Sequence, residues 1–442
     1  MRTLIISITI LFCTLTSTAW DEVTHAYMTQ MIPELVKDPE LKTLLQHNIS
    51  EFTYGCWYTD IYQYTNNKIE RISALNPHRL AMHNAAFVPY LQNPAVQKQA
   101  NYQKLLALYL GSLAHIAEDL WYDNNLNPYQ KLKTDRMKGD SKHGAFVAKQ
   151  FGYTSIKVKR YLPYKELFKI YDEAGQLTPK IDTPEKFELL MDRWSRNQYK
   201  KLTALKFLNF IGGNQFFNSS PWTAANLKDA PGGMLNAAEV AAKMVENAWL
   251  RINGKQVPLI IHAQYMWPVG SMSFMLSNPD AGKMLNHYSW NVFDNKGDTI
   301  RGNLHSKLGN NMVGIFKPLE TFNEGEQYTL VFRNDSDNKI LAFPFTPRFD
   351  QKMDLRMAEK KPWYKTMGLG LFGFIPLFAL SLMFFGIGGI IRFRWSAKQR
   401  DKKMPTRLII AKIFFRTIGI IAFAGAIYVF VNKGWIIVET VL

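Results

Sequence analysis

Cysteine is nearly absent from this chain of 442 residues. Of its two cysteines, Cys13 lies in an apolar N-terminal segment and Cys56 is alone in everything that follows. Once that segment is removed, no pair remains to form an internal disulfide, even in an oxidising compartment. We therefore expect the folded part to be stabilised by an ordinary hydrophobic core or by bound metal.

Charged residues are absent from 367–391, which is long enough to cross a bilayer with some tilt. This stretch predicts a first transmembrane helix. A second apolar stretch, 413–432, carries one charged residue, Arg416, near its start, where a long side chain can reach the membrane interface. It predicts a second transmembrane helix, followed by a short tail at 433–442.

The segment between these stretches, 392–412, is rich in lysine and arginine and contains one acidic residue, Asp401. Because positively charged loops stay in the cytoplasm, the first helix is expected to run inward and the second outward. The N-terminal part up to about Tyr364 and the C-terminal tail are then exported, as parts of a multi-pass protein of the cell (inner) membrane. The formal net charge of +17 belongs partly to this loop, so it is weak evidence for a nucleic-acid partner.

Residues 1–19 agree with export. They combine Arg2, the apolar run Leu4–Phe12 and small residues ending in Ser17-Thr18-Ala19, which is the layout of a cleaved signal peptide. The alternative is an uncleaved anchor, but the apolar run is short for one. We expect the mature protein to begin at Trp20.

The exported part changes in character near residue 257. Helical periodicity predominates from 20 to 256 and predicts an all-helical domain. From 257 to 350, short β-type runs alternate with Asn, Asp and Gly turns, and the stretch from Lys317 to Phe332 resembles the late strands of bacterial immunoglobulin-like modules. We predict a mainly α fold: the helical domain, then a small β-sandwich, then a charged linker at 351–366.

Histidine is concentrated in the first third of the chain, which holds six of the nine. The sharpest pattern is His115, Asp119 and Asp123, at positions i, i+4 and i+8, which project from one face of a helix. The residues between them are mostly apolar, so this polar stripe is expected in a buried helix, where imidazole and carboxylate groups need partners. A metal ion would satisfy them; the alternative is a hydrogen-bonded His–Asp pair in the core.

The predicted mature terminus adds two metal-ligand candidates. Trp20 would present a free α-amino group with a pKa of ~7.7–8, which binds zinc once deprotonated. His25 follows five residues later. Together with the His115 helix, these residues resemble the zinc-dependent phospholipase C family and its relatives, the single-strand-specific zinc nucleases. The resemblance covers about 20–149, and it implies an all-helical fold with two or three Zn²⁺ ions bound by His, Asp and the terminal Trp.

The resemblance extends to individual positions. Asp60, in Gly55-Cys-Trp-Tyr-Thr-Asp, is similar to the family's Gly-x-x-x-Pro-Asp carboxylate, with Thr59 in place of the proline. His83 resembles the next histidine of the family, although the spacing leaves His78 as a rival. For Asp60 the alternative role is a helix N-cap.

The implied ligand sets share one residue. Trp20, His25 and Asp119 would hold one ion. Asp60, His83, His115 and Asp119 would hold another, with Asp119 as the bridge. Asp60 is also the expected base toward water.

At the third metal site, this sequence departs from the pattern of the family. Asp123 stands where glycosylphosphatidylinositol-specific phospholipase D, a more distant relative, has a histidine. His143 is followed at the fourth position by Val147 instead of a carboxylate, and Asp140 is a candidate replacement. The third site is therefore expected to be altered or absent.

These residues predict a membrane-anchored, zinc-dependent phosphodiesterase. Anchoring beside lipid headgroups favours a membrane phospholipid or another lipid-linked phosphodiester as substrate. A nuclease acting on single-stranded nucleic acid is the alternative, with Trp57, Trp121 and Tyr122 as candidate surfaces for base stacking. A degenerate, metal-stabilised binding or scaffold protein is a third hypothesis, favoured by the altered third site.

Overall fold

The computed structural model describes residues 22–64, 75–132, 147, 151, 159–179, 181–198, 227–266, 270–306, 312–334, 336–337, 339–347, 378–387 and 405–432. The predicted signal peptide, the linker at 351–366 and the tail at 433–442 lie outside them, as do Trp20 and His143. The chain divides into two units, one formed by 1–210 and 222–357 and the other by 211–221 and 358–442. Each unit is described by itself.

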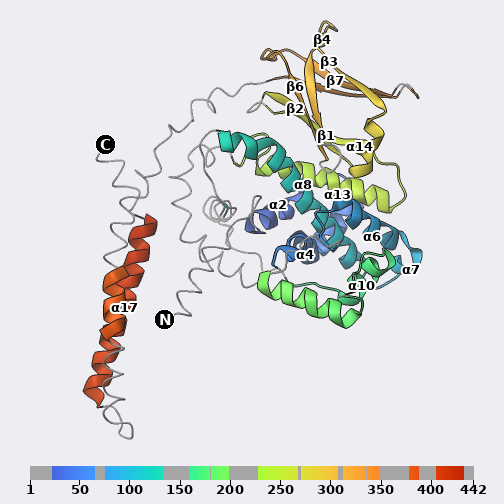
Figure 1. Ribbon diagram of the computed structural model, residues 1–442. Coiled ribbons are helices and arrows are strands. Elements are labelled where there is room, and N and C mark those ends of the chain that lie inside the picture. The colour runs from blue at the N-terminus through green and yellow to red at the C-terminus, as the bar shows by residue number, and fades with distance from the viewer. Residues whose placement is uncertain are drawn as a thin grey trace. The chain divides into compact units, whose positions relative to one another are not determined.

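The first part of the larger unit is helical, as predicted (Figure 1). Its elements are α2 (Glu22–Leu35), α3 (Pro39–His47), α4 (Ile49–Thr59), the 3-10 helix η1 (Ile61–Tyr64), α6 (Leu80–Gln92), α7 (Pro94–Gln97), α8 (Tyr102–Leu132), α10 (Tyr164–Glu173), a helix at 184–198 and α13 (Met234–Ile252). Helix α8 is the longest, with 31 residues, and packs against both α4 and α13. Leu105, Leu106, Leu108 and Leu110 of α8 are completely buried, so this helix forms the centre of the core.

Two glycines allow α4 and α8 to approach closely. A Cβ atom on Gly55 would lie 2.0 Å from the carbonyl oxygen of Leu108, and one on Gly111 would lie 1.9 Å from that of Phe52. Only glycine permits such backbone contact. The contact places the end of α4 beside the middle of α8. Asp60 is the C-cap residue of α4, where its N–H bonds to the Trp57 and Tyr58 carbonyls, and it directly precedes η1.

The β part of the same unit contains two four-stranded antiparallel sheets. One has the strand order β1 (Ile260–Met266), β2 (Ser271–Leu276), β6 (Val313–Pro318), β5 (Gly302–Ser306). The other has the order β4 (Thr299–Ile300), β3 (Tyr288–Phe293), β7 (Tyr328–Asn334), β8 (Ile340–Phe345). The rings of Phe274 and Phe332 meet between the two sheets, with centroids 5.2 Å apart. A short helix that the sequence did not predict, α14 (Pro279–Leu285), follows β2.

Polar side chains join the helical part to the first sheet. Ser273 of β2 donates a hydrogen bond of 2.6 Å to Asn125 of α8. Asn236 of α13 accepts from Trp121 Nε1 at 2.6 Å and donates to Gln264 of β1 at 2.6 Å. All of these groups are buried or half-buried, where a hydrogen bond is costly to lose. One side of α8 is thereby fixed to the β part.

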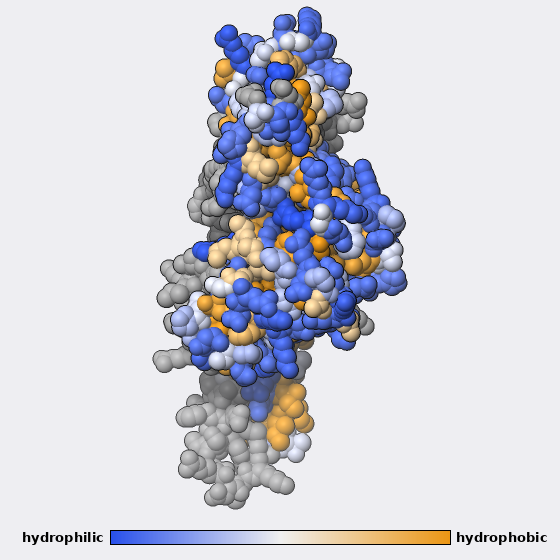
Figure 2. All heavy atoms as spheres, turned by 90° about the vertical axis from the view of Figure 1, so that its right-hand side faces the viewer, coloured by the Kyte–Doolittle hydropathy of each residue, from blue (hydrophilic) through white to orange (hydrophobic). Residues whose placement is uncertain are grey.

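The smaller unit contains two apolar helices, 378–387 and α17 (Thr406–Asn432). They pack together: Ser381 Oγ donates to the Gly419 carbonyl at 2.9 Å, and the rings of Phe384 and Phe415 stack. In the described part of the chain, one helix is long and apolar enough to cross a membrane, within Leu408–Ala426. Figure 2 shows apolar side chains on the surface of this helix.

Helix α17 begins seven residues before the predicted start at 413, so the end of the predicted basic loop is helical. Lysine and arginine are good helix formers, which allows the helix to continue into the polar segment. The predicted first transmembrane helix, 367–391, is described only over 378–387.

Candidate metal centre

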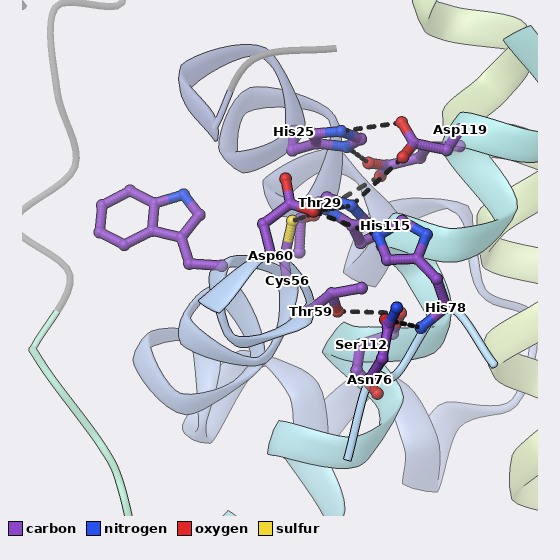
Figure 3. A network of polar contacts seen from close by, with 12 residues as sticks. His25, Thr29, Cys56, Thr59, Asp60, Asn76, His78, Ser112, His115 and Asp119 are labelled. Atoms are coloured by element: carbon purple, nitrogen blue, oxygen red, sulfur yellow. Dashed lines mark hydrogen bonds and ion pairs between the residues drawn. The ribbon is translucent and has the colours of Figure 1, made fainter. Parts of the chain in front are cut away.

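Five side chains from four segments meet beside the middle of α8 (Figure 3). His25 lies on α2, Asp60 at the end of α4, His78 in the turn before α6, and His115 and Asp119 one turn apart on α8. The His78 backbone N–H donates to Asn76 Oδ1 at 3.0 Å, which holds the turn that presents its ring. Four of the five residues are buried, and His78 is half-buried.

The carboxylate of Asp119 faces two imidazoles through different oxygen atoms. Its Oδ1 lies 3.0 Å from His25 Nε2, and its Oδ2 lies 3.3 Å from His115 Nε2. The rings of His25 and His115 stack, with centroids 3.8 Å apart. Figure 3 shows Asp119 pointing toward both rings. This is the geometry of a carboxylate that bridges two sites.

Asp60 forms a second group of contacts around His115. Its Oδ1 lies 3.6 Å from His115 Nε2 and 3.1 Å from His78 Nε2. One oxygen therefore faces two imidazole nitrogens. The ligand atoms of Asp60, His78 and His115 all lie within 4.8 Å of one another, as do those of His25, Cys56 and His115.

Three donor atoms at this centre have no hydrogen-bond partner although they are buried: His25 Nε2, His115 Nε2 and Asp119 Oδ1. His25 Nε2 and Asp119 Oδ1 lie 3.0 Å apart, and His115 Nε2 lies 3.3 Å from Asp119 Oδ2, but neither contact has hydrogen-bond geometry. Buried polar atoms without partners are costly and call for an explanation, such as an ion. Imidazole and carboxylate are ligands that divalent metals prefer. The residues at this centre therefore fit a metal ion.

Opposite charges shift the pKa values at this centre. Burial penalises the charged forms, but His115 and His25 hold the pKa of the Asp119 carboxyl well below its usual range. Burial and a neighbouring imidazole lower the pKa of His25, but the charge of Asp119 and the close contacts with Asp119 and Glu118 outweigh them and raise it to about 10. A metal ion would compete with protons for these nitrogen atoms.

The structure places His83 apart from this centre. His83 Nε2 lies 2.7 Å from Ser112 Oγ, whose hydroxyl donates to the Tyr109 carbonyl at 2.6 Å, so the ring nitrogen is the donor to Ser112. Burial lowers the pKa of His83 to about 3. Of the two histidines left open by the sequence, His78 is the one whose ring nitrogen lies beside Asp60 and His115, so the geometry favours it as the ligand. His83 Nδ1 is buried without a hydrogen-bond partner but belongs to neither group of converging ligand atoms.

Asp123 lies two helical turns beyond His115 and is half-buried. Neither Asp123 nor Asp119 belongs to the two groups of converging ligand atoms among the described residues; Asp119 is placed at the centre by its contacts with His25 and His115. Trp20 and His143, the remaining predicted ligands, lie outside those residues.

Two residues of the centre escaped the sequence reasoning. Cys56 Sγ lies 3.7 Å from His115 Nδ1, and Glu118 Oε2 lies 2.6 Å from His25 Nδ1. The side chain of Glu118 is completely buried. The available signal was spacing: Cys56 precedes Asp60 by one helical turn, so both share a face of α4.

Comparisons with known proteins identify no relative. No family model and no curated protein sequence matches this chain. Among solved structures, the N-terminal part of the bacterial S-layer protein SbsC matches 70% of this chain and 79% of its own, with 11% identity and a TM-score of 0.17. The S-layer protein rSbsC(31-844) matches 70% of this chain and 46% of its own, also with 11% identity and a TM-score of 0.17. Similarity at this level carries no inference about fold or function.

Proposed function

We propose that the protein is a zinc-dependent phosphodiester hydrolase related to the phospholipase C family. The observation that carries this proposal is a cluster of three buried ligand atoms, His25 Nε2, His115 Nε2 and Asp119 Oδ1, which have ion-pair contacts but no hydrogen bond. A hydrogen-bonded core pair of His115 and Asp119 would not leave those atoms without partners. The i, i+4 motif on α8 therefore has the features of a metal site.

Two ions fit the arrangement of the ligands. His25 and Asp119 would bind one of them, with the amino group of Trp20 as the proposed additional ligand. Asp60, His78, His115 and Asp119 would bind the other. Zinc at such a site neutralises the charge of a phosphodiester and lowers the pKa of water to about 7.

The protein residues have distinct tasks in this reaction. Asp119 keeps the two sites together, because its oxygens face different imidazoles. Asp60 would accept a proton from water; His115 and His78 favour its ionised form by lowering its pKa despite burial, which also limits its strength as a base. The buried surroundings exclude bulk water and strengthen the charge interactions with a bound phosphodiester.

A membrane phosphodiester is the proposed substrate class. Helix α17 and helix 378–387 would form a transmembrane hairpin, with the helical domain and an immunoglobulin-like β module on the exported side of the cell membrane. The nuclease alternative is weakened by its own candidate stacking residues. Trp57, Trp121 and Tyr122 are 5%, 0% and 3% exposed, and Trp57 Nε1 is bonded to the Glu22 carbonyl. Buried rings of this kind offer no platform for bases.

The test uses the full chain in detergent, stripped with a chelator and reloaded with zinc. Bound zinc is quantified, and turnover is measured on a generic phosphodiester, on phosphatidylcholine vesicles and on single-stranded DNA. We expect zinc to bind and to restore turnover of the generic substrate and the vesicles. Failure to bind zinc would reject the metal site, zinc without turnover would favour the scaffold hypothesis, and turnover of DNA alone would favour the nuclease.

A further inference from the structure

The ring of His25 is held between two consecutive carboxylates of α8. Glu118 Oε2 lies 2.6 Å from His25 Nδ1, while Asp119 Oδ1 lies 3.0 Å from His25 Nε2. The side chains of His25 and Glu118 are both completely inaccessible to solvent. Glu118 therefore contacts His25 through Nδ1, the ring nitrogen that faces away from Asp119 and the candidate metal centre.

The second oxygen of Glu118 also contacts α2. Thr29 Oγ1, one helical turn after His25, lies 3.5 Å from Glu118 Oε1 and donates to it. Both oxygens of this carboxylate thus face side chains from one helix. The contact to His25 is much the shorter, and a short bond between an imidazole and a carboxylate is typical of a charge-assisted interaction.

The direction of the short bond follows from the charge of Glu118. When its carboxylate is ionised it only accepts hydrogen bonds, so Nδ1 carries the proton. In the neutral imidazole, the lone pair then resides on Nε2, which is the atom without a hydrogen-bond partner. A carboxylate behind a histidine in this way selects the tautomer that binds metal and increases the basicity of the ligand.

We propose that Glu118 is a positioning residue, which fixes the tautomer and ring orientation of His25 so that Nε2 is available to a metal ion. The inference rests on the metal centre of the proposed function. His115 has a weaker counterpart in the Sγ atom of Cys56, 3.7 Å from its Nδ1. The alternative is that Glu118 only ties α2 to α8, in which case the metal would not sense its charge.

The test compares wild type with Glu118→Gln, Glu118→Asp and, as matched control, Thr29→Val, each as the full chain in detergent. Zinc affinity is measured by competition with a chelator. Glu118→Gln keeps the shape but removes the charge, and Glu118→Asp keeps the charge but shortens its reach. We expect both to bind zinc about 10–100-fold more weakly. Thr29→Val removes only the long contact and should bind zinc like the wild type.

A spectroscopic readout separates positioning from a purely structural role. In the zinc-loaded wild type, long-range proton–nitrogen spectra should show His25 protonated at Nδ1, with that proton protected from exchange. Loss of this protection in Glu118→Gln, together with weaker zinc binding, supports the proposal. Equal zinc affinity and an unchanged His25 signal in both Glu118 variants would overturn it. If the wild type itself binds no zinc, the proposed function fails as well, so the two failures are distinguishable.

Discussion

Replacing Asp119 with Asn tests the bridging carboxylate directly. The change removes one negative charge and preserves the shape of a side chain that is 7% exposed. In the metal-free protein it separates buried imidazoles from their shared partner. Breaking a buried ion pair typically costs about 3–5 kcal/mol, whereas exchanging one neutral hydrogen-bond partner costs about 1–3 kcal/mol.

Zinc distinguishes a metal ligand from a structural pair. At a zinc concentration about 100-fold above the dissociation constant, binding stabilises the native wild type by about 2.7 kcal/mol. Asp119→Asn should lose most of this gain, because both ions lose a ligand. Asp123→Asn is the matched control, one turn beyond Asp119 on the same helix, and should retain it.

The assay is urea unfolding with zinc and with chelator, accompanied by metal analysis and turnover of a generic phosphodiester. If Asp119→Asn bound as much zinc, gained as much stability from it and kept its turnover, the bridging role would be refuted.

Four further predictions concern other parts of the molecule. Gly111→Ala should destabilise the fold by about 1–3 kcal/mol or more and weaken zinc binding, because its Cβ would meet the Phe52 carbonyl at 1.9 Å. The control in the denaturant titrations is Gly386→Ala, since a Cβ at Gly386 would have no atom within 4 Å. Burial and the charge of Lys243 lower the pKa of His262 from 6.5 to about 4, so the contribution of the neutral ring to stability is present above pH 6.5 and is lost as the pH falls through about 4. The difference in unfolding free energy between wild type and His262→Gln should therefore change between these pH values. A difference that stays constant with pH would contradict the lowered pKa. N-terminal sequencing should find Trp20 first, and another first residue would remove its amino group from the ligand set. A reporter fused after Gly302 should be exported and one inserted near Ser396 should be cytoplasmic, whereas reversed signals would reject the orientation.

The sequence was most informative where spacing alone determines which residues share a face. His115 and Asp119 are one turn apart on α8 and point to the same side, as the i, i+4 spacing predicts. The strands also followed local pattern: the run from Tyr328 became β7, and the run from Ile340 became β8. Helix α14 was missed because its seven residues are too few to show a helical period.

Residues whose roles depend on tertiary contacts were harder to predict. His78 and His83 lie five residues apart, and only the turn held by Asn76 decides which ring faces Asp60. The contact of Glu118 with His25 depends on the packing of α2 against α8, which the sequence does not specify. The aromatic residues considered for base stacking are buried by packing, for which the sequence alone gives no measure.

The most direct test of the central claim is a crystal structure of the zinc-loaded protein with diffraction data on both sides of the zinc absorption edge. Anomalous peaks are expected between His25 and Asp119 and among Asp60, His78 and His115, with Asp119 in contact with both. Absence of anomalous density at this cluster in crystals grown with zinc would contradict the metal centre, and with it the proposed hydrolase.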